Sequence, residues 1–184
     1  MWIIAALGNP GNRYKNTRHN VGFMAADILS MKHRIVLNTK EDVQYGRGSI
    51  NNNDVIVVKP LTYMNLSGSV VIRVIKYSAA SIDSLVVIHD DLDIETGRLK
   101  LKRGGSSGGH KGVQSIIDAL GGSKDFIRVK IGIGRDSLIP AEDYVLGRFT
   151  KDEREIIEET AYKACDAIYT IISDGLDKAM NLYN

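Results

Sequence analysis

Short apolar runs recur along the chain and predict the strands of one sheet. Residues 2–7, 55–58 and 85–88 are continuously apolar and rich in Val and Ile, which is typical of strands buried on both faces. Residues 129–133 alternate between apolar and polar or small side chains, which also indicates a strand. Residues 46–50 are separated from 55–58 only by a short run of Asn and Asp, so these two segments predict a hairpin.

Helical spacing fills the intervals between these runs. Apolar residues three or four apart predict helices at 21–31, 70–77, 113–120 and 157–171. The first apolar stripe comprises Val21, Met24, Ile28 and Met31. Strands that alternate with helices predict an α/β fold, here a single layered domain over residues 1–184 with a mixed, largely parallel central sheet flanked by helices. Ligands bind such folds beyond the carboxyl ends of the strands.

The composition is that of an ordinary globular protein. Of the 184 residues, 43% are hydrophobic and 25% are charged, which argues against disorder. The single cysteine, Cys165, forms no internal disulfide and no zinc spacing with the histidines, which favours a reducing cytoplasm. No apolar run approaches the ~20 residues that span a bilayer. We therefore expect a cytoplasmic protein without a membrane partner.

Basic residues are concentrated in two segments, although the net charge is only +2. Residues 98–111 hold five Lys or Arg and no acid, and residues 126–135 add Arg128, Lys130 and Arg135. Neighbouring basic segments of this kind predict either a phosphate-binding patch or the solvated edge of a sheet. The residues alone leave both interpretations open.

Polar clusters follow four predicted strands, the fourth of which is the basic segment at residues 98–103. Asn9 and His19 come after the first, Asn65 lies in "PLTYMNLSG", Asp90 in "HDDLD" and His110 in "GGSSGGHKG". Because the carboxyl ends of parallel strands meet at one edge of the sheet, these clusters predict a single cleft.

The residue types in this cleft suit a hydrolase that activates water. A histidine such as His19 can take a proton from water near neutral pH. A carboxylate such as Asp90 on its other ring nitrogen would fix the tautomer and stabilise the imidazolium. The amides of Asn9 and Asn65 can hold a carbonyl or a developing oxyanion. The chain has no G-x-S-x-G motif, which favours direct attack by water over a covalent intermediate.

Other interpretations of the same residues remain open at this point. His19 would cap the following helix, or the acids of "HDDLD" would bind Mg²⁺, although they lack EF-hand spacing. "GGSSGGHKG" departs from the G-x-x-x-x-G-K-[ST] phosphate loop because Lys111 precedes a glycine. Its glycines still permit a tight turn with exposed N–H groups, or a purely structural loop.

The segments "GNPGNRYKNTRHNVG", "YMNLSG", "HDDLD", "GGHKG" and "RVKIGIGR" occur in the order and spacing of one family. The chain resembles the bacterial-type peptidyl-tRNA hydrolases from its first strand to "GLDKAMN" near its end. The resemblance implies a monomeric α/β enzyme without cofactor or metal. Its partner would be peptidyl-tRNA, whose ester between the peptide and the 3′-terminal ribose it would cleave, recycling tRNA from prematurely released chains.

The resemblance also implies roles for individual residues. His19 would be the general base and Asp90 its orienting partner, while Asn9 and Asn65 would place substrate and water. Further residues would line the cleft or grip the tRNA 5′-phosphate: Tyr14, Met64 and His110 for the cleft, and Lys102 and Lys130 for the phosphate.

One position departs from the family pattern. Lys111 stands where the family has an asparagine associated with the peptide and the attacking water. A lysine donates hydrogen bonds but accepts none, so Lys111 would bind substrate differently, stabilise an oxyanion, or turn outward to a tRNA phosphate. Residues 139–149, with Pro140 and Gly147, form a candidate lid.

Two rival functions belong to different classes. An RNA-binding relative that has lost catalysis would lack part of the catalytic set, yet Asn9, His19, Asn65 and Asp90 are all present. A metal-dependent phosphoesterase would lose activity on chelation and would not require the ester bond. The retained set favours the hydrolase.

Overall fold

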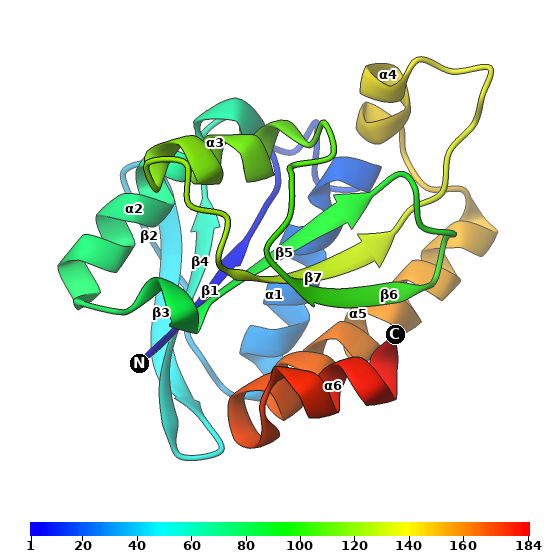
Figure 1. The fold of residues 1–184 in the computed structure, drawn as a ribbon. Coiled ribbons are helices and arrows are strands. Elements are labelled where there is room, and N and C mark those ends of the chain that lie inside the picture. The colour runs from blue at the N-terminus through cyan, green and yellow to red at the C-terminus, as the bar shows by residue number, and fades with distance from the viewer.

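The computed structural model describes residues 1–184 and consists of one seven-stranded sheet between two layers of helices (Figure 1). The strands are β1 (Trp2–Ala6), β2 (Asn38–Lys40), β3 (Val43–Ile50), β4 (Asn53–Pro60), β5 (Leu85–Asp91), β6 (Leu99–Arg103) and β7 (Ile127–Gly132). Their order across the sheet is β2-β3-β4-β1-β5-β7-β6. The central strands β4, β1, β5 and β7 are parallel, and the pairings at both edges are antiparallel. The predicted α/β fold is confirmed.

The predicted hairpin is formed by β3 and β4, with a tighter turn than the spacing suggested. Ile50 pairs with Asn53, so only Asn51 and Asn52 form the turn. Both have positive φ, 48° and 61°, which is the conformation of a type I′ hairpin turn and one that asparagine tolerates well.

Six α-helices and three short 3₁₀ turns complete the fold. The helices are α1 (Val21–Lys32), α2 (Ser67–Ser78), α3 (Lys111–Ala119), α4 (Ala141–Leu146), α5 (Lys151–Asp174) and α6 (Leu176–Tyr183), and the turns are η1 (Arg18–Asn20), η2 (Met64–Leu66) and η3 (Ile82–Ser84). All four predicted helices are present, as α1, α2, α3 and α5. No helix combines the length and hydrophobicity needed to cross a membrane.

The sheet separates two hydrophobic cores. Ile4 and Ala6 of β1 face α1, α5 and α6, whereas Ile3 and Ala5 face α2 and α3 (Figure 1). These four side chains have no exposed surface, which explains why β1 is apolar without interruption. Cys165 of α5 is buried in the first core, and burial raises the pKa of its thiol to about 12.

The start of α1 lies very close to the carboxyl ends of β1 and β5. A Cβ atom at Gly22 would be 2.5 Å from the carbonyl oxygen of Leu7 and 2.7 Å from that of Ile88. Only glycine permits this approach. The close packing holds η1, which immediately precedes α1, at the sheet edge where ligands are expected.

Candidate active site

A cleft of about 670 Å³ opens beyond the carboxyl ends of β1, β4 and β5. Its walls come from the loops after these strands, from the glycine-rich loop before α3 and from α4. Every residue predicted for the site lines this cleft: Asn9, Tyr14, His19, Met64, Asn65, Asp90, Lys102, His110, Lys111 and Lys130. The loops after the parallel strands β1 and β4 and the end of β5 converge as the fold rule predicts. The rule does not account for His110, because β6 is antiparallel and ends at the opposite edge, so the glycine-rich loop after it has to return to bring His110 to the cleft.

A buried carboxylate joins two histidines in the cleft. Nδ1 of His19 and Nε2 of His110 each lie 2.9 Å from the same oxygen, Oδ1 of Asp90. Because a carboxylate only accepts hydrogen bonds, both ring nitrogens donate to it. Neutral His19 then has a lone pair on Nε2, which makes no hydrogen bond within the protein. Its ring lines the cleft, so this nitrogen is available to accept a proton.

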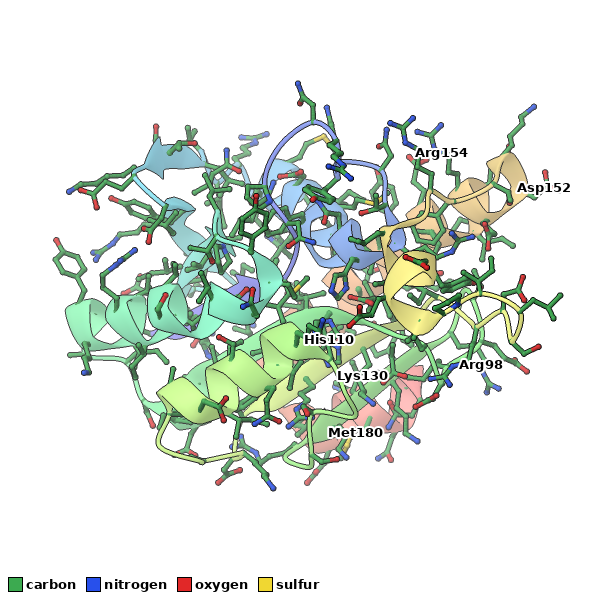
Figure 2. The ribbon with its side chains drawn as sticks, turned by 90° about the horizontal axis from the view of Figure 1, so that it is seen from above. Arg98, His110, Lys130, Asp152, Arg154 and Met180 are labelled. Carbon is green, nitrogen blue, oxygen red and sulfur yellow. The ribbon has the colours of Figure 1, made fainter.

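His110 has both ring nitrogens committed. Its Nδ1 accepts hydrogen bonds from the backbone N–H groups of Gly112 and Val113, at 3.2 and 3.3 Å, and so caps α3. Backbone N–H groups only donate, which fixes the proton of His110 on Nε2, facing Asp90. Figure 2 shows His110 at the end of α3 that faces α4. His19 makes no capping hydrogen bond to α1, so the interpretation of His19 as the cap of the helix that follows it is wrong.

Asp90 stays ionised in this setting. The side chain is only 2% exposed, and burial alone would raise its pKa, but the neighbouring His19 and His110 and their hydrogen bonds lower the pKa well below its usual range. The site therefore keeps a permanent negative charge beneath His19.

Sequence reasoning assigned no role to His89, a third histidine of the cleft. Its Nδ1 donates to the backbone oxygen of Asp90 at 2.7 Å, and its ring lies 4.8 Å from that of His110, edge to face. Burial, and secondarily the charge of His110, lowers the pKa of His89 to about 3. His89 is therefore a neutral packing partner. The only sequence signal for its presence at the site is its position beside Asp90 in "HDDLD".

This pKa predicts acid sensitivity. An unfolded chain takes up a proton on His89 below its ordinary pKa of about 6.5, whereas the folded chain does so only near 3. The free energy of unfolding should therefore rise with pH between about 3 and 6.5 and level off above, and His89 should contribute a few kcal/mol to that rise. Urea unfolding across this pH range should give a flatter curve for His89→Asn than for wild type. Parallel curves would contradict the assignment.

Asn9 is held by a partner that sequence reasoning missed. Its backbone N–H donates to Oδ1 of Asn20 at 2.8 Å, and the amide of Asn20 donates back to its carbonyl at 2.9 Å. Oδ1 of Asn9 accepts from the backbone N–H of Met64 at 2.9 Å. The NH₂ group of Asn9 is thus left to donate into the cleft.

Comparison with known proteins settles the family. Residues 3–184 match the family model described as peptidyl-tRNA hydrolase. The chain belongs to this family.

Curated relatives and solved structures agree along the whole chain. A peptidyl-tRNA hydrolase of Thermodesulfovibrio yellowstonii is 50% identical over 100% of this chain and 99% of its own length. One of Carboxydothermus hydrogenoformans is 46% identical over 100% and 98%. A crystal structure of peptidyl-tRNA hydrolase from Acinetobacter baumannii superimposes with a TM-score of 0.92 at 33% identity, covering 98% of this chain and 93% of that one. The chain is therefore a hydrolase enzyme.

The basic segments of this peptidyl-tRNA hydrolase family member divide into exposed and buried parts. Lys102 and Lys130 line the cleft, together with Lys100 and Arg135. The ammonium group of Lys130 is paired with Asp91. Burial alone would raise the pKa of Asp91, but the hydrogen bond from Lys130 lowers it, so part of the positive charge of Lys130 is compensated.

Arg128 does not belong to the basic surface that the sequence suggested. It is only 1% exposed, and its guanidinium donates to the backbone oxygens of Gly105 and Ser106. Arg128 therefore holds the glycine-rich loop that leads to His110, which gives this loop a defined anchor. Sequence reasoning could not separate it from Lys130, two positions further along the same strand.

The other two acids of "HDDLD", Asp91 and Asp93, are each paired with a base and do not cluster with Asp90. Asp91 pairs with Lys130, and Asp93 pairs with Arg135 at 3.2 Å. Ligating atoms of His19, Asp90 and His110 do lie within 4.8 Å of one another. Their N···O separations of 2.9 Å are hydrogen-bond distances, and Nδ1 of His110 is occupied by α3. These contacts favour a proton-transfer network over a magnesium site.

The helix α4 forms one wall of the cleft, within the candidate lid 139–149, and an ion pair links it to α3. Nζ of Lys111 lies 2.6 Å from Oε1 of Glu142, and this contact lowers the pKa of Glu142. Both side chains are exposed. In this structure Lys111 therefore reaches toward α4 and not toward the imidazole of His19.

Restoring the family asparagine should have a small effect. Lys111→Asn should keep kcat/KM within about 5-fold of wild type, because an exposed ion pair contributes little. Glu142→Gln removes the same pair from the other side and should behave alike. Steady-state hydrolysis of an N-blocked aminoacyl-tRNA measures both. Complete loss in a folded Lys111→Asn variant would show that the lysine takes part in the chemistry.

Proposed function

We propose that this enzyme hydrolyses the ester bond between a peptide and the 3′-terminal ribose of tRNA, and so recycles tRNA from prematurely released chains. The observation that carries the proposal is the His19–Asp90 pair, with the unpartnered Nε2 of His19 at a cleft. A free imidazole nitrogen backed by a buried carboxylate is suited to remove a proton from water.

The proposed reaction needs only groups present in the chain. Nε2 of His19 takes a proton from a water molecule whose oxygen attacks the ester carbonyl. The Asp90 carboxylate stabilises the imidazolium that forms, as in other carboxylate–histidine pairs. When the tetrahedral intermediate collapses, the bond between the carbonyl carbon and the ribose oxygen breaks. The imidazolium then gives its proton to the departing ribose oxygen. The products are a free carboxylic acid and tRNA with an intact 3′ end.

Asn9 and Asn65 would place the substrate. The free NH₂ group of Asn9 can donate to the ester carbonyl and to the oxyanion that develops there. Asn65 lies next to Met64 in η2, on a neighbouring wall of the cleft, and would contact the peptide part of the substrate. Tyr14 and Met64 would line the space for the last residues of the peptide.

The basic rim of the cleft would bind the acceptor stem. Lys102 and Lys130 would grip the 5′-phosphate, which contributes affinity without reading bases. Lys102 is the better test because no carboxylate is paired with it, whereas Lys130 already contacts Asp91.

Lys102→Ala should chiefly weaken substrate binding. We expect a higher KM and little change in kcat. The slope of the logarithm of the tRNA association constant against the logarithm of the salt concentration should be smaller in magnitude by about one. Lys163→Ala, an exposed lysine on α5, is the matched control and should leave both values unchanged. Titrations at several salt concentrations make the measurement. A fall in kcat at saturating substrate would contradict the phosphate-binding role.

The proposed reaction is tested by the position of the bond cleaved. N-acetylated aminoacyl-tRNA is incubated with the enzyme in H₂¹⁸O containing excess chelator, and both products are analysed by mass spectrometry. Attack by water on the carbonyl should place one ¹⁸O in the released carboxyl group and none in the tRNA. Tight binding without cleavage would instead identify an RNA-binding relative, and loss of cleavage on chelation would favour metal chemistry.

A further inference from the structure

We propose that Arg18 is a positioning residue that ties the cleft wall formed by α4 to the turn carrying His19. This inference rests on the proposed function, because it concerns how His19 is oriented to act as the general base. Arg18 does not line the cleft, so it would act through its neighbours and not on the substrate.

The guanidinium of Arg18 is buried, and its burial has a structural use. The residue is 8% exposed and directly precedes His19 in η1. A buried charge is costly unless it is paired and hydrogen-bonded. Nη1 and Nη2 of Arg18 meet this requirement with partners from outside their own turn, whereas its Nε is buried without a hydrogen-bond partner.

Those partners are Arg148, in the connection between α4 and α5, and Glu153, in the first turn of α5. Nη1 donates to the backbone oxygen of Arg148 at 2.9 Å. Nη2 donates to both carboxylate oxygens of Glu153, at 3.0 and 2.8 Å. Glu153 also accepts the backbone N–H of Thr150 at 2.7 Å within the capping box of α5. One guanidinium thus holds the end of the lid and the start of the longest helix.

Aromatic rings complete the anchor. The guanidinium carbon lies 4.3 Å from the ring centroid of Tyr144 in α4 and 5.3 Å from that of Phe149, within the range of cation–π attraction. The hydroxyl of Tyr144 donates to the backbone oxygen of Ile133, just beyond β7, at 2.9 Å. Through these contacts α4 is fixed both to Arg18 and to the sheet.

The backbones are joined as well. The N–H of Arg18 donates to the carbonyl of Gly147 at 3.0 Å, and Thr17 forms an isolated β-bridge with Arg148. A Cβ atom at Gly147 would lie 3.0 Å from Nη1 of Arg18, so the absence of a side chain there makes room for the guanidinium.

These contacts give α4 and His19 a common support. Ala141, Glu142, Val145 and Leu146 of α4 line one wall of the cleft, and His19 lies on another. Because His19 is held by Asp90 on one side and follows Arg18 in the chain on the other, a change in this anchor should alter the direction of its imidazole. A small misplacement of a catalytic group can reduce turnover by up to about 100-fold.

The test compares Arg18→Lys with Arg154→Lys, a matched change at an exposed arginine at the start of α5 (Figure 2). A lysine keeps the charge but cannot reproduce the forked hydrogen bonds to Arg148 and Glu153. We expect Arg18→Lys to lower kcat for N-acetylated aminoacyl-tRNA by about 10- to 100-fold, with a smaller change in KM. Arg154→Lys should leave both values unchanged.

Imidazole ¹⁵N NMR of the free enzyme supplies a readout independent of activity. Wild-type His19 should give the signals of a neutral ring protonated on Nδ1, and Arg18→Lys should broaden or shift them, while Arg154→Lys should not. This measurement tests the anchor even if the wild type cleaves no ester. Wild-type kcat together with unchanged His19 signals in Arg18→Lys would overturn the proposal, whatever its melting temperature. If that variant does not fold, Glu153→Gln should give a weaker effect of the same kind, and unchanged values there would also overturn the proposal.

Discussion

Replacing His19 with alanine should lower kcat by about 10²–10⁴-fold, the usual effect of losing a general base. The reason is structural as well as chemical, because Nε2 of His19 is an unpartnered ring nitrogen at the cleft, and Asp90 already holds the other ring nitrogen. Single-turnover hydrolysis of N-acetylated aminoacyl-tRNA at saturating enzyme would isolate the chemical step, with excess chelator present for wild type and variant.

The control for this experiment is another histidine outside the cleft. His33 follows the end of α1, where its ring stacks on Tyr169 at 6.4 Å between centroids. His33→Ala should leave kcat unchanged. Equal turnover in His19→Ala and wild type would remove His19 from the role of base, and an equal loss in both variants would indicate a general effect on folding.

Asp90→Asn should also lower kcat strongly, by about 10- to 100-fold, which corresponds to losing a hydrogen bond to a charged group. The amide oxygen of asparagine can still accept from His19, so the ring should keep its direction. The negative charge that stabilises the imidazolium is lost, however, and His110 competes for the same oxygen. The loss should therefore be smaller than for His19→Ala.

The measurement is the rate constant for hydrolysis under single-turnover conditions, with circular dichroism to verify the fold. Asp125→Asn, which neutralises an exposed carboxylate on the loop before β7, is the matched control and should be silent. A loss as large as that of His19→Ala would contradict an orienting and charge-stabilising role for Asp90.

The sequence predicted that Asn9, Asn65 and Asp90 lie at one cleft because the fold obeys a simple topological rule. The runs that became β1, β4 and β5 are short and apolar, and each is followed by polar residues. Once the strands are parallel, Asn9, Asn65 and Asp90 must meet at one edge. The hairpin was equally visible, since asparagines separate two strand-like segments.

What the sequence could not give was the direction of side chains within elements. Met31 belonged to the stripe that located α1, yet it is 65% exposed, while Ala25 and Ala26 have no exposed surface. The helix packs against both the sheet and α5 through small residues. Apolar spacing picks out large side chains and does not show where small residues allow two elements to pack closely.

Long-range partners were also out of reach. Arg18 and Glu153 are 135 positions apart in the sequence. Lys111 and Glu142 are 31 positions apart. Arg128 carries the same charge as Lys130 and differs from it in what surrounds the side chain. The sequence predicted the segment of α4 only as part of a candidate lid. Its six residues are too few to show the apolar spacing that predicts a helix.

The burial of Cys165 has a practical consequence for following α4. The only sulfhydryl in the chain is enclosed in the core and stays protonated at ordinary pH, so it should resist alkylating dyes, which react with thiolates. A reporter cysteine placed at an exposed position of the cleft wall can therefore be labelled alone, without first removing the native one. Fluorescence from such a probe would show whether α4 moves during a catalytic cycle or stays anchored to Arg18 and the sheet.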